Sequence, residues 1–255
     1  MTGWDRLSIE LDAWSAAGRA AEFWWRDDDA IDTTPALDRL LSLRAALDLP
    51  LALAVIPANA RPALIPALKG QAGIDILQHG YAHVSHRPEG EKKAELGADR
   101  DLWDIAREVS DGRGRMLGLF DGDWLDVMVP PWNRIDPAVI NLLPGLGFHG
   151  LSTFNARAAD GISSDLTVVN THVDIIDWVG TREYAGDDAV LSAAVEHLAA
   201  KRTGSADPAE ATGILSHHLA HDDACWGFIE KFGRFTALHP AVRWRSATDL
   251  FPVSS

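Results

Sequence analysis

Two histidines four residues apart and a run of three aspartates are the residues of this chain with the clearest potential for chemistry. The spacing of His79 and His83 lets two imidazoles converge on one metal ion. Asp27, Asp28 and Asp29 are consecutive, and their mutual repulsion is costly unless a cation or a raised pKa relieves it. An aspartate with two histidines forms a ligand set suited to zinc and to other divalent transition metals. Because three protein ligands leave coordination positions open, the pattern is typical of a catalytic metal site.

Hydrolysis at such a metal also requires proton transfer. A base takes a proton from water, and an acid protonates the departing group. An aspartate of the run that is not a ligand, together with His217 from a distant part of the chain, could divide these two roles. We interpret the neighbouring His218 and His221 as a core residue and a residue at the start of a helix.

The predicted strands explain how these distant residues come together. Apolar runs alternate with helical patterns, which is typical of a mostly parallel sheet covered by helices. Strands are expected at 22–26, 51–56, 74–78, 125–129, 150–153, 173–176 and 213–216. Polar clusters follow five of them, at 27–29, 79–83, 130–132, 177–178 and 217–218. Because the carboxyl ends of parallel strands share one edge of a fold, we expect the five clusters to form one site.

Helices are expected between these strands. Thr33 or Thr34 should cap a helix with Pro35 in its first turn. A polar helix is expected over residues 89–109, and residues 201–212 are predicted to form a loop. Further helices are expected at 62–69, 137–143, 185–201 and 222–238.

Composition narrows the class of protein. The chain has 255 residues, of which 47% are hydrophobic and 24% charged, so it is long enough and apolar enough for a large core. The single cysteine excludes an internal disulfide. The net charge of −14 argues against nucleic-acid binding. The chain has no long apolar run for membrane insertion and no basic-then-apolar start, so we expect one catalytic domain over residues 1–255 in the cytoplasm.

Five short segments, in this order, resemble the motifs of the polysaccharide deacetylases, carbohydrate esterase family four. The segments are WRDDDA (25–30), HGYAH (79–83), VPPWNR (129–134), DIIDW (174–178) and LSH (215–217). The resemblance implies an α/β fold, a distorted (β/α) barrel with seven or eight mostly parallel strands. It also implies metal-dependent hydrolysis of an N- or O-linked acetyl group on a sugar, with one divalent ion, expected to be zinc, as the cofactor.

The same resemblance assigns roles to the aspartate run and the histidine pair. Asp28 matches the general base, and Asp29 matches the ligand that completes the metal site with His79 and His83. The family usually has two aspartates where this chain has three. The register in which Asp27 is the base and Asp28 the ligand therefore stays open.

The remaining motifs supply the other groups that the resemblance implies. His217 matches the general acid, and Asp177 a buried charge partner that orients a catalytic group. Trp132 and Trp178 match the walls of the acyl pocket. A backbone N–H near Trp132 would assist the metal in stabilising an oxyanion.

Besides the third aspartate, three positions depart from the family pattern. Ala30 stands where a glycine usually follows the aspartates, and Gly80 where a serine or threonine follows the first histidine. Val129 stands where an arginine usually precedes the two prolines. We expect Arg134, which follows that segment, to supply the missing charge and to contact substrate. These departures indicate a divergent member with a reshaped pocket.

Three functions from different classes fit these residues. The first is a deacetylase of a carbohydrate derivative, acting on a small-molecule or lipid-linked substrate. The second is another C–N hydrolase on the same barrel, with a cyclic amide, ureide or formamide as substrate. The third is a non-catalytic carbohydrate- or metal-binding domain. Because a binding domain needs neither a base nor an acid, the presence of Asp28, Asp29 and His217 together favours an enzyme.

Overall fold

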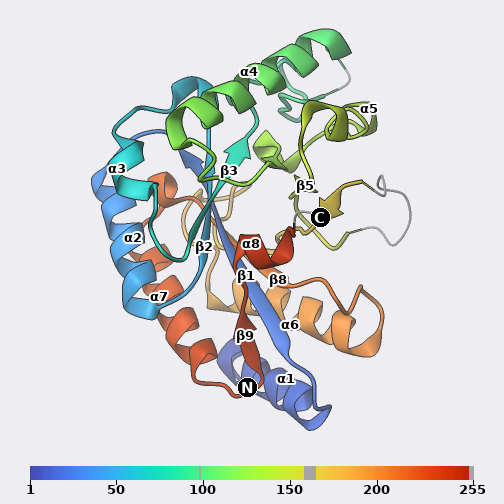
Figure 1. Ribbon diagram of the computed structural model, residues 1–255. Helices are drawn as coiled ribbons and strands as arrows, with labels where there is room; N and C mark the ends of the chain where they lie inside the picture. The colour runs from blue at the N-terminus through green and yellow to red at the C-terminus, as the bar shows by residue number, and fades with distance from the viewer. Residues whose placement is uncertain (98, 158–164, 253–255) are drawn as a thin grey trace.

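The computed structural model describes residues 1–97, 99–157 and 165–252. A sheet of nine parallel strands lies at its centre (Figure 1). Eight strands follow the order β6-β5-β4-β3-β2-β1-β8-β7, and β9 pairs with the first residues of β1. These eight strands curl into a half-barrel with helices around it, so the expected distorted (β/α) barrel is confirmed.

The longest strand is central and carries the aspartate run. The strands are β1 (Ala21–Ala30), β2 (Leu51–Val55), β3 (Ile74–His79), β4 (Val127–Val129), β5 (Gly150–Leu151), β6 (Thr167–Val168), β7 (Val173–Asp174), β8 (Thr212–Ser216) and β9 (Val242–Trp244). Most of β1 is buried, as expected for a parallel strand that has neighbours on both sides.

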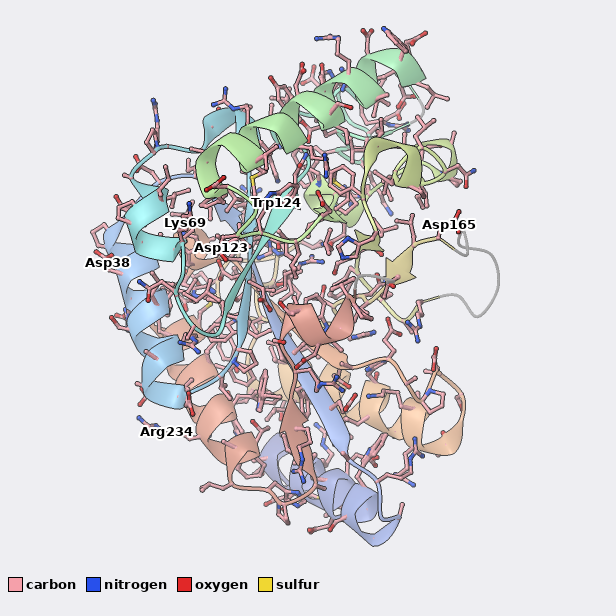
Figure 2. The ribbon with its side chains drawn as sticks, in the orientation of Figure 1. Asp38, Lys69, Asp123, Trp124, Asp165 and Arg234 are labelled. Atoms are coloured by element: carbon pink, nitrogen blue, oxygen red, sulfur yellow. The ribbon has the colours of Figure 1, made fainter. Side chains whose placement is uncertain are left out.

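Helices cover the outside of the sheet. They are α1 (Gly3–Ala16), α2 (Pro35–Leu47), α3 (Leu64–Leu68), α4 (Leu102–Phe120), α5 (Pro137–Ile140), α6 (Asp187–Thr203), α7 (Asp223–Ala237) and α8 (Ala247–Leu250). Short 3-10 turns lie at Pro57–Asn59, Pro131–Asn133, Pro144–Leu146 and His218–Ala220. Helices α2 and α7 lie side by side, and the charged Asp38 and Arg234 are on their outer sides (Figures 1 and 2). In the described part of the chain, no helix combines the length and apolarity needed to cross a bilayer.

Local sequence patterns predicted the start of α2 correctly and the start of α4 incorrectly. Helix α2 begins at Pro35 because the Thr34 side chain accepts a hydrogen bond from the N–H of Leu37. The helix expected over 89–109 is wrong in its first half, since residues 82–97 contain no helix and α4 begins at Leu102. Here the buried Glu95 side chain accepts hydrogen bonds from backbone N–H groups of the preceding loop, so tertiary contacts override helix propensity.

Alternation along β1 sends its side chains to two environments. Trp24 faces the interior of the half-barrel, where it packs with Ala52, Ala54, Leu77 and Val129. Trp25 faces the covering helices. Arg26 and Asp28 therefore share the interior side with Trp24, whereas Asp27 shares the helix side with Trp25. A charged layer thus stands above the apolar interior at the carboxyl end of the sheet.

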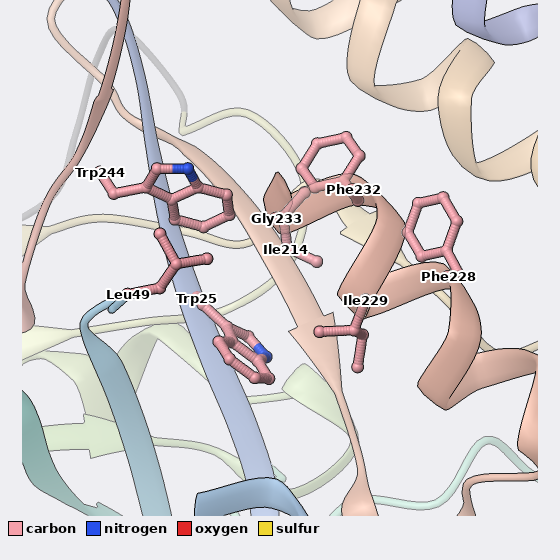
Figure 3. Close-up of a pocket in the computed structure, with 8 residues that line it drawn as sticks. All are labelled: Trp25, Leu49, Ile214, Phe228, Ile229, Phe232, Gly233 and Trp244. Carbon is pink, nitrogen blue, oxygen red and sulfur yellow. The ribbon is translucent and has the colours of Figure 1, made fainter. Parts of the chain in front are cut away.

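The helix side of β1 contains an apolar pocket (Figure 3). Trp25 of β1 and Ile214 of β8 line it together with the side chains that α7 directs at the sheet, Phe228, Ile229 and Phe232. Leu49, Gly233 and Trp244 complete the lining. The lining is almost wholly apolar, so this pocket is part of the core, and the polar chemistry lies beyond it, where the strands end.

Candidate active site

The end of β1 gives the three aspartates different surroundings. A β-bulge interrupts the pairing of β1 with β2 between Asp27 and Ala30. Asp29 has a φ of 75°, a left-handed conformation that costs free energy for a residue other than glycine. This conformation breaks the alternation of β1 and directs Asp29 toward the end of β3. There its Oδ1 atom lies 3.1 Å from His79 Nε2 and 3.3 Å from His83 Nε2.

Asp29, His79 and His83 fit a divalent metal ion. The Nδ1–H of His79 donates to the carbonyl of Val129 at 2.9 Å, so the neutral ring carries its lone pair on Nε2. Oδ1 of Asp29 is buried and has no hydrogen-bond donor. A buried carboxylate oxygen without a donor is costly unless a cation contacts it. One ligand atom from each residue lies within 4.8 Å of the other two.

The pKa shifts of this group indicate a site that requires positive charge. Burial raises the pKa of the Asp29 carboxyl, but His79, His217 and His83 outweigh burial and lower it. Burial lowers the pKa of His79, but the carboxylates of Asp28 and Asp29 outweigh it and raise it. Burial and the charge of His79 lower the pKa of His83. Because the two pKa values shift in opposite directions, His79 is the ring that more readily takes up an additional proton, and a divalent cation would replace that proton.

A buried arginine holds Asp28. The Nε of Arg26 lies 2.9 Å from Asp28 Oδ1 and its Nη2 lies 3.0 Å from Oδ2, with both side chains at most 2% exposed. Arg26 also donates to Ser152 Oγ and to Asn133 Oδ1, each at 2.6 Å. This two-bond pairing fixes the plane of the Asp28 carboxylate and neutralises its charge. Sequence reasoning missed this pair; the one signal for it is the i, i+2 spacing, which places both residues on one side of a strand.

The structure does not bring Arg134 to Asp28. Its Nη1 donates to the backbone carbonyl of Lys93 at 2.7 Å, and its side chain is exposed at the edge of the site. The charge expected from Arg134 is supplied by Arg26, from a different element. Val129 can therefore stand in the family's arginine position without leaving Asp28 unpaired.

Asp27 has partners of its own. Its carboxylate accepts hydrogen bonds from His218 Nδ1 at 2.5 Å and from Ser216 Oγ at 2.6 Å, and the His218 backbone N–H donates to it at 3.0 Å. The Asp27 and His218 side chains are fully buried. Asp27 thus fastens the residues on both sides of His217 to β1 and lies away from the ligand group. Sequence reasoning missed this pair, although it interpreted His218 as a core residue.

His217 faces the site from the end of β8. Its ring lies 4.8 Å from the Trp178 ring at 78°, and its Nδ1 is buried without a hydrogen-bond partner. Asp174 is nearby and accepts hydrogen bonds from Trp178 Nε1 at 2.9 Å and from the Ile176 N–H at 3.0 Å. Burial raises the pKa of Asp174, and the charge of His217 opposes that rise.

Asp177 lies in a different environment from the one expected. Its Oδ1 accepts hydrogen bonds from the backbone N–H groups of Val179 and Gly180, at 3.2 and 2.9 Å, and so holds a turn. The carboxylate near His217 is that of the partly buried Asp174, three residues earlier. The reason is positional, because Asp174 ends β7 and faces β8, whereas Asp177 has already entered the loop.

The loop after β4 closes one side of the site. Trp132 and Asn133 have φ values of 55° and 56°, so two consecutive residues are left-handed. The bond from Arg26 to Asn133 Oδ1 stabilises this loop from below. As a result the Trp132 ring lies 4.3 Å from the His83 ring, so the Trp132 wall and a candidate ligand are in contact.

The departure at Gly80 has a steric cause. Gly80 has a φ of 52°, and a Cβ there would lie 2.2 Å from Glu95 Oε2 and 2.5 Å from the Pro131 ring. The Glu95 carboxylate accepts hydrogen bonds from the N–H groups of Tyr81 and Ala82, at 3.1 and 2.7 Å. Any larger residue would push Glu95 out, and the loop that presents His83 would lose its anchor.

Among the described residues, a second group has metal-ligand types. We call His172, His197 and Glu210 the second cluster; all three are buried, with ligand atoms within 4.8 Å of one another. It lies at the opposite end of the sheet, since the Gly213 N–H, near the start of β8, donates to His172 Nδ1. The buried Lys201 lies close enough for its charge to lower the pKa values of both histidines, in addition to the effect of burial.

The fold has counterparts among solved structures, although no protein-family model and no curated protein matches the sequence. A structure from Mycobacterium smegmatis, described as that of a polysaccharide deacetylase, has a TM-score of 0.63 at 17% identity over 90% of this chain and 88% of that one. A family 4 acetyl xylan esterase from Clostridium thermocellum, in complex with a cobalt ion, has a TM-score of 0.54 at 12% identity over 90% of each chain.

A third counterpart is the Bc1960 peptidoglycan N-acetylglucosamine deacetylase. It has a TM-score of 0.56 at 15% identity, over 94% of this chain and 97% of that one. The protein therefore has the fold of the polysaccharide deacetylases. The resemblance that the five motifs carry is confirmed at the level of the fold.

Proposed function

We propose that this protein is a metal-dependent hydrolase that removes an acetyl group from a carbohydrate derivative. One observation carries the proposal: the buried Oδ1 of Asp29, which has no hydrogen-bond donor, lies within 3.3 Å of the Nε2 atoms of His79 and His83, and a second carboxylate, Asp28, is close enough for its charge to act on His79. A purely structural site has no use for that second carboxylate. The shared fold with deacetylases supports the choice of an acetyl group.

Asp29, His79 and His83 would hold the metal ion. Two imidazoles and one carboxylate suit zinc. When bound, the ion supplies Lewis acidity toward the acyl oxygen and lowers the pKa of water. The hydrogen bond from His79 to Val129 keeps the ring oriented with Nε2 toward the ion.

Asp28 acts as the general base in this proposal. It lies next in sequence to the ligand Asp29, and Arg26 holds its carboxylate in one plane while leaving the second lone pair of each oxygen free. The carboxylate can therefore accept a proton from the attacking water without first having to turn.

His217 acts as the general acid on the other side of the site. Its Nδ1 has no hydrogen-bond partner among the described residues, so the ring is available to donate a proton to the leaving nitrogen or oxygen. Asp27 keeps His217 in place through Ser216 and His218. Trp132 and Trp178, on opposite sides, would wall the acetyl group.

The test is acetate release by zinc-loaded protein from a panel of substrates. The panel comprises N-acetylated monosaccharides, nucleotide-linked and lipid-linked N-acetyl sugars, chitin oligomers and an O-acetylated xylan. Release from a small or lipid-linked substrate that disappears in Asp28→Asn, at unchanged metal content, is the expected result. Hydrolysis of formamides or ureides with no acetate release would establish the other C–N hydrolase. The single domain over residues 1–255 and the cytoplasmic location stay predictions from sequence.

A further inference from the structure

Two cationic side chains meet at the edge of the candidate site, beside Trp132. The Lys93 ammonium lies 5.9 Å from the centroid of the Trp132 ring. The Arg134 guanidinium donates to the Lys93 backbone carbonyl at 2.7 Å, so the two cationic residues are neighbours on the surface. Trp132 in turn contacts His83, one of the three candidate ligands.

Unlike the arginines of the same region, Lys93 and Arg134 have no carboxylate partner among the described residues. The chain carries a net charge of −14, and the loop before α4 pairs its arginines with acids. The ion pairs are Arg87 with Glu91 and Asp99, and Arg100 with Glu108. Within the described residues, no carboxylate lies within ion-pair distance of Lys93 or Arg134. Two unpaired cations beside a hydrolytic site, on an acidic protein, indicate that their partner is a ligand.

We propose that Lys93 and Arg134 bind a negatively charged group of the substrate, a carboxylate or a phosphate on or next to the acetylated sugar. The inference rests on the proposed function and adds a substrate class to it. Arginine presents several donors in a fixed plane that matches carboxylate and phosphate oxygens, and lysine adds a mobile charge. The Trp132 ring between these cations and His83 offers an apolar surface for the face of a sugar.

The two sources of negative charge share one recognition chemistry, so the experiment includes both. The probes are N-acetylglucosamine as the neutral substrate, its 1-phosphate, and N-acetylmuramic acid as the carboxylate. For each probe, kcat/KM of the zinc-loaded protein is measured, and the quantity compared is the ratio of an anionic probe to the neutral one. We expect this ratio to exceed one for the preferred anion and to fall as salt is raised.

The variants are Lys93→Met and Arg134→Gln, with Lys92→Met as the matched control. Lys92 is the adjacent exposed lysine, so its substitution removes the same charge from the same loop. We expect the anionic-to-neutral ratio to fall about tenfold in each of the first two variants, as for the loss of one hydrogen bond to a charged group. The ratio should change less than twofold in Lys92→Met.

The inference is overturned if the ratio is unchanged in Lys93→Met and Arg134→Gln, or if Lys92→Met lowers it equally. Calorimetric binding of the same probes to zinc-loaded Asp28→Asn separates this inference from the proposed function. If an anionic probe binds in a Lys93-dependent way but the parent protein releases acetate from no probe, the deacetylase proposal fails and the anion site stands. If the parent protein releases acetate from neutral and anionic probes at equal rates, the deacetylase proposal stands and the anion site fails.

Discussion

The candidate metal site and the second cluster use the same residue types in opposite ways. In the first, Nδ1 of His79 donates to a carbonyl, which leaves a lone pair on Nε2 toward Asp29. In the second, Nδ1 of His172 accepts from the Gly213 N–H at 3.0 Å, so the proton is on Nε2, which faces Glu210 at 3.4 Å. A protonated nitrogen has no lone pair for a metal.

Ring orientation adds to the difference. The His172 and His197 rings stack with centroids 3.5 Å apart and planes at 17°, so their lone pairs lie in nearly parallel planes and do not meet at one point. The His79 and His83 rings are 5.1 Å apart and tilted by 52°, which lets their lone pairs converge. Residue identity and proximity therefore do not define a metal site. The hydrogen bond behind each imidazole and the tilt between rings decide whether the ligands can share one ion.

Metal content gives the largest expected contrast between the two groups. We expect His79→Ala to lose the bound zinc that the parent retains at one ion per chain, because only two ligands remain. His172→Ala should keep one ion per chain, since the second cluster presents a protonated nitrogen. Elemental analysis after dialysis measures both. Zinc retained in His79→Ala and lost in His172→Ala would reverse our assignment of the two groups.

Substitutions in the aspartate run should give the next largest effect, on turnover. Asp28→Asn should keep the metal and lower kcat about 10²–10⁴-fold, because an amide cannot take a proton from water at neutral pH. Turnover and zinc content are measured on the same preparation. If Asp28→Asn loses zinc while Asp27→Asn keeps it and loses turnover, Asp27 and Asp28 are the base and the ligand.

The proposed acid should show a smaller and substrate-dependent effect. His217→Ala should lower kcat about 10²-fold on an acetamide and less on an activated acetate ester, because a poor leaving group depends more on protonation. Zinc content should stay at the parent level. Equal losses on the two substrates would remove His217 from the acid role, and His218→Ala would be compared next.

The second cluster should affect stability and its pH dependence. Burial, together with the charges of His172 and Lys201, lowers the pKa of His197 from 6.5 to about 3. Between these values the unfolded chain binds a proton that the native protein does not, so the free energy of unfolding falls as the pH falls through this window. For this residue the loss between pH 7 and pH 5 is about 2 kcal/mol.

His197→Gln should remove that part of the pH dependence while keeping a hydrogen-bonding group for Thr212 Oγ1. Urea unfolding at pH 7 and pH 5 measures the difference, with the exposed His86→Gln as control. An unchanged difference between the two pH values would show that His197 is charged in the native protein. In that case the second cluster would carry a positive charge in the native protein, and the contrast between the two clusters would be wrong on this point.

Several features of the fold and the site could be predicted from the sequence alone. Alternating apolar runs and helical patterns were enough for a mostly parallel sheet covered by helices, and the resemblance of the five motifs added the barrel. Local capping residues were enough for the start of α2. The order of the five motifs predicted that residues from β1, β3, β4, β7 and β8 share one edge. These features depend on periodicity and on side chains that are near one another in sequence, and both can be read from the sequence directly.

Other features depended on tertiary structure. The bulge and the left-handed φ of Asp29 decide which aspartate faces the histidines. Neither can be predicted from a run of three identical residues. The partner of Asp28 is Arg26, held by contacts more than 100 residues away, and the carboxylate near His217 is Asp174. The tautomers of His79 and His172 likewise follow from distant backbone groups. Sequence by itself determined which chemical groups follow each strand, because an apolar run and the residues next to it are local features of the chain. Only the packed structure decided which way each group faces, because that direction is set by hydrogen bonds between segments far apart in the chain.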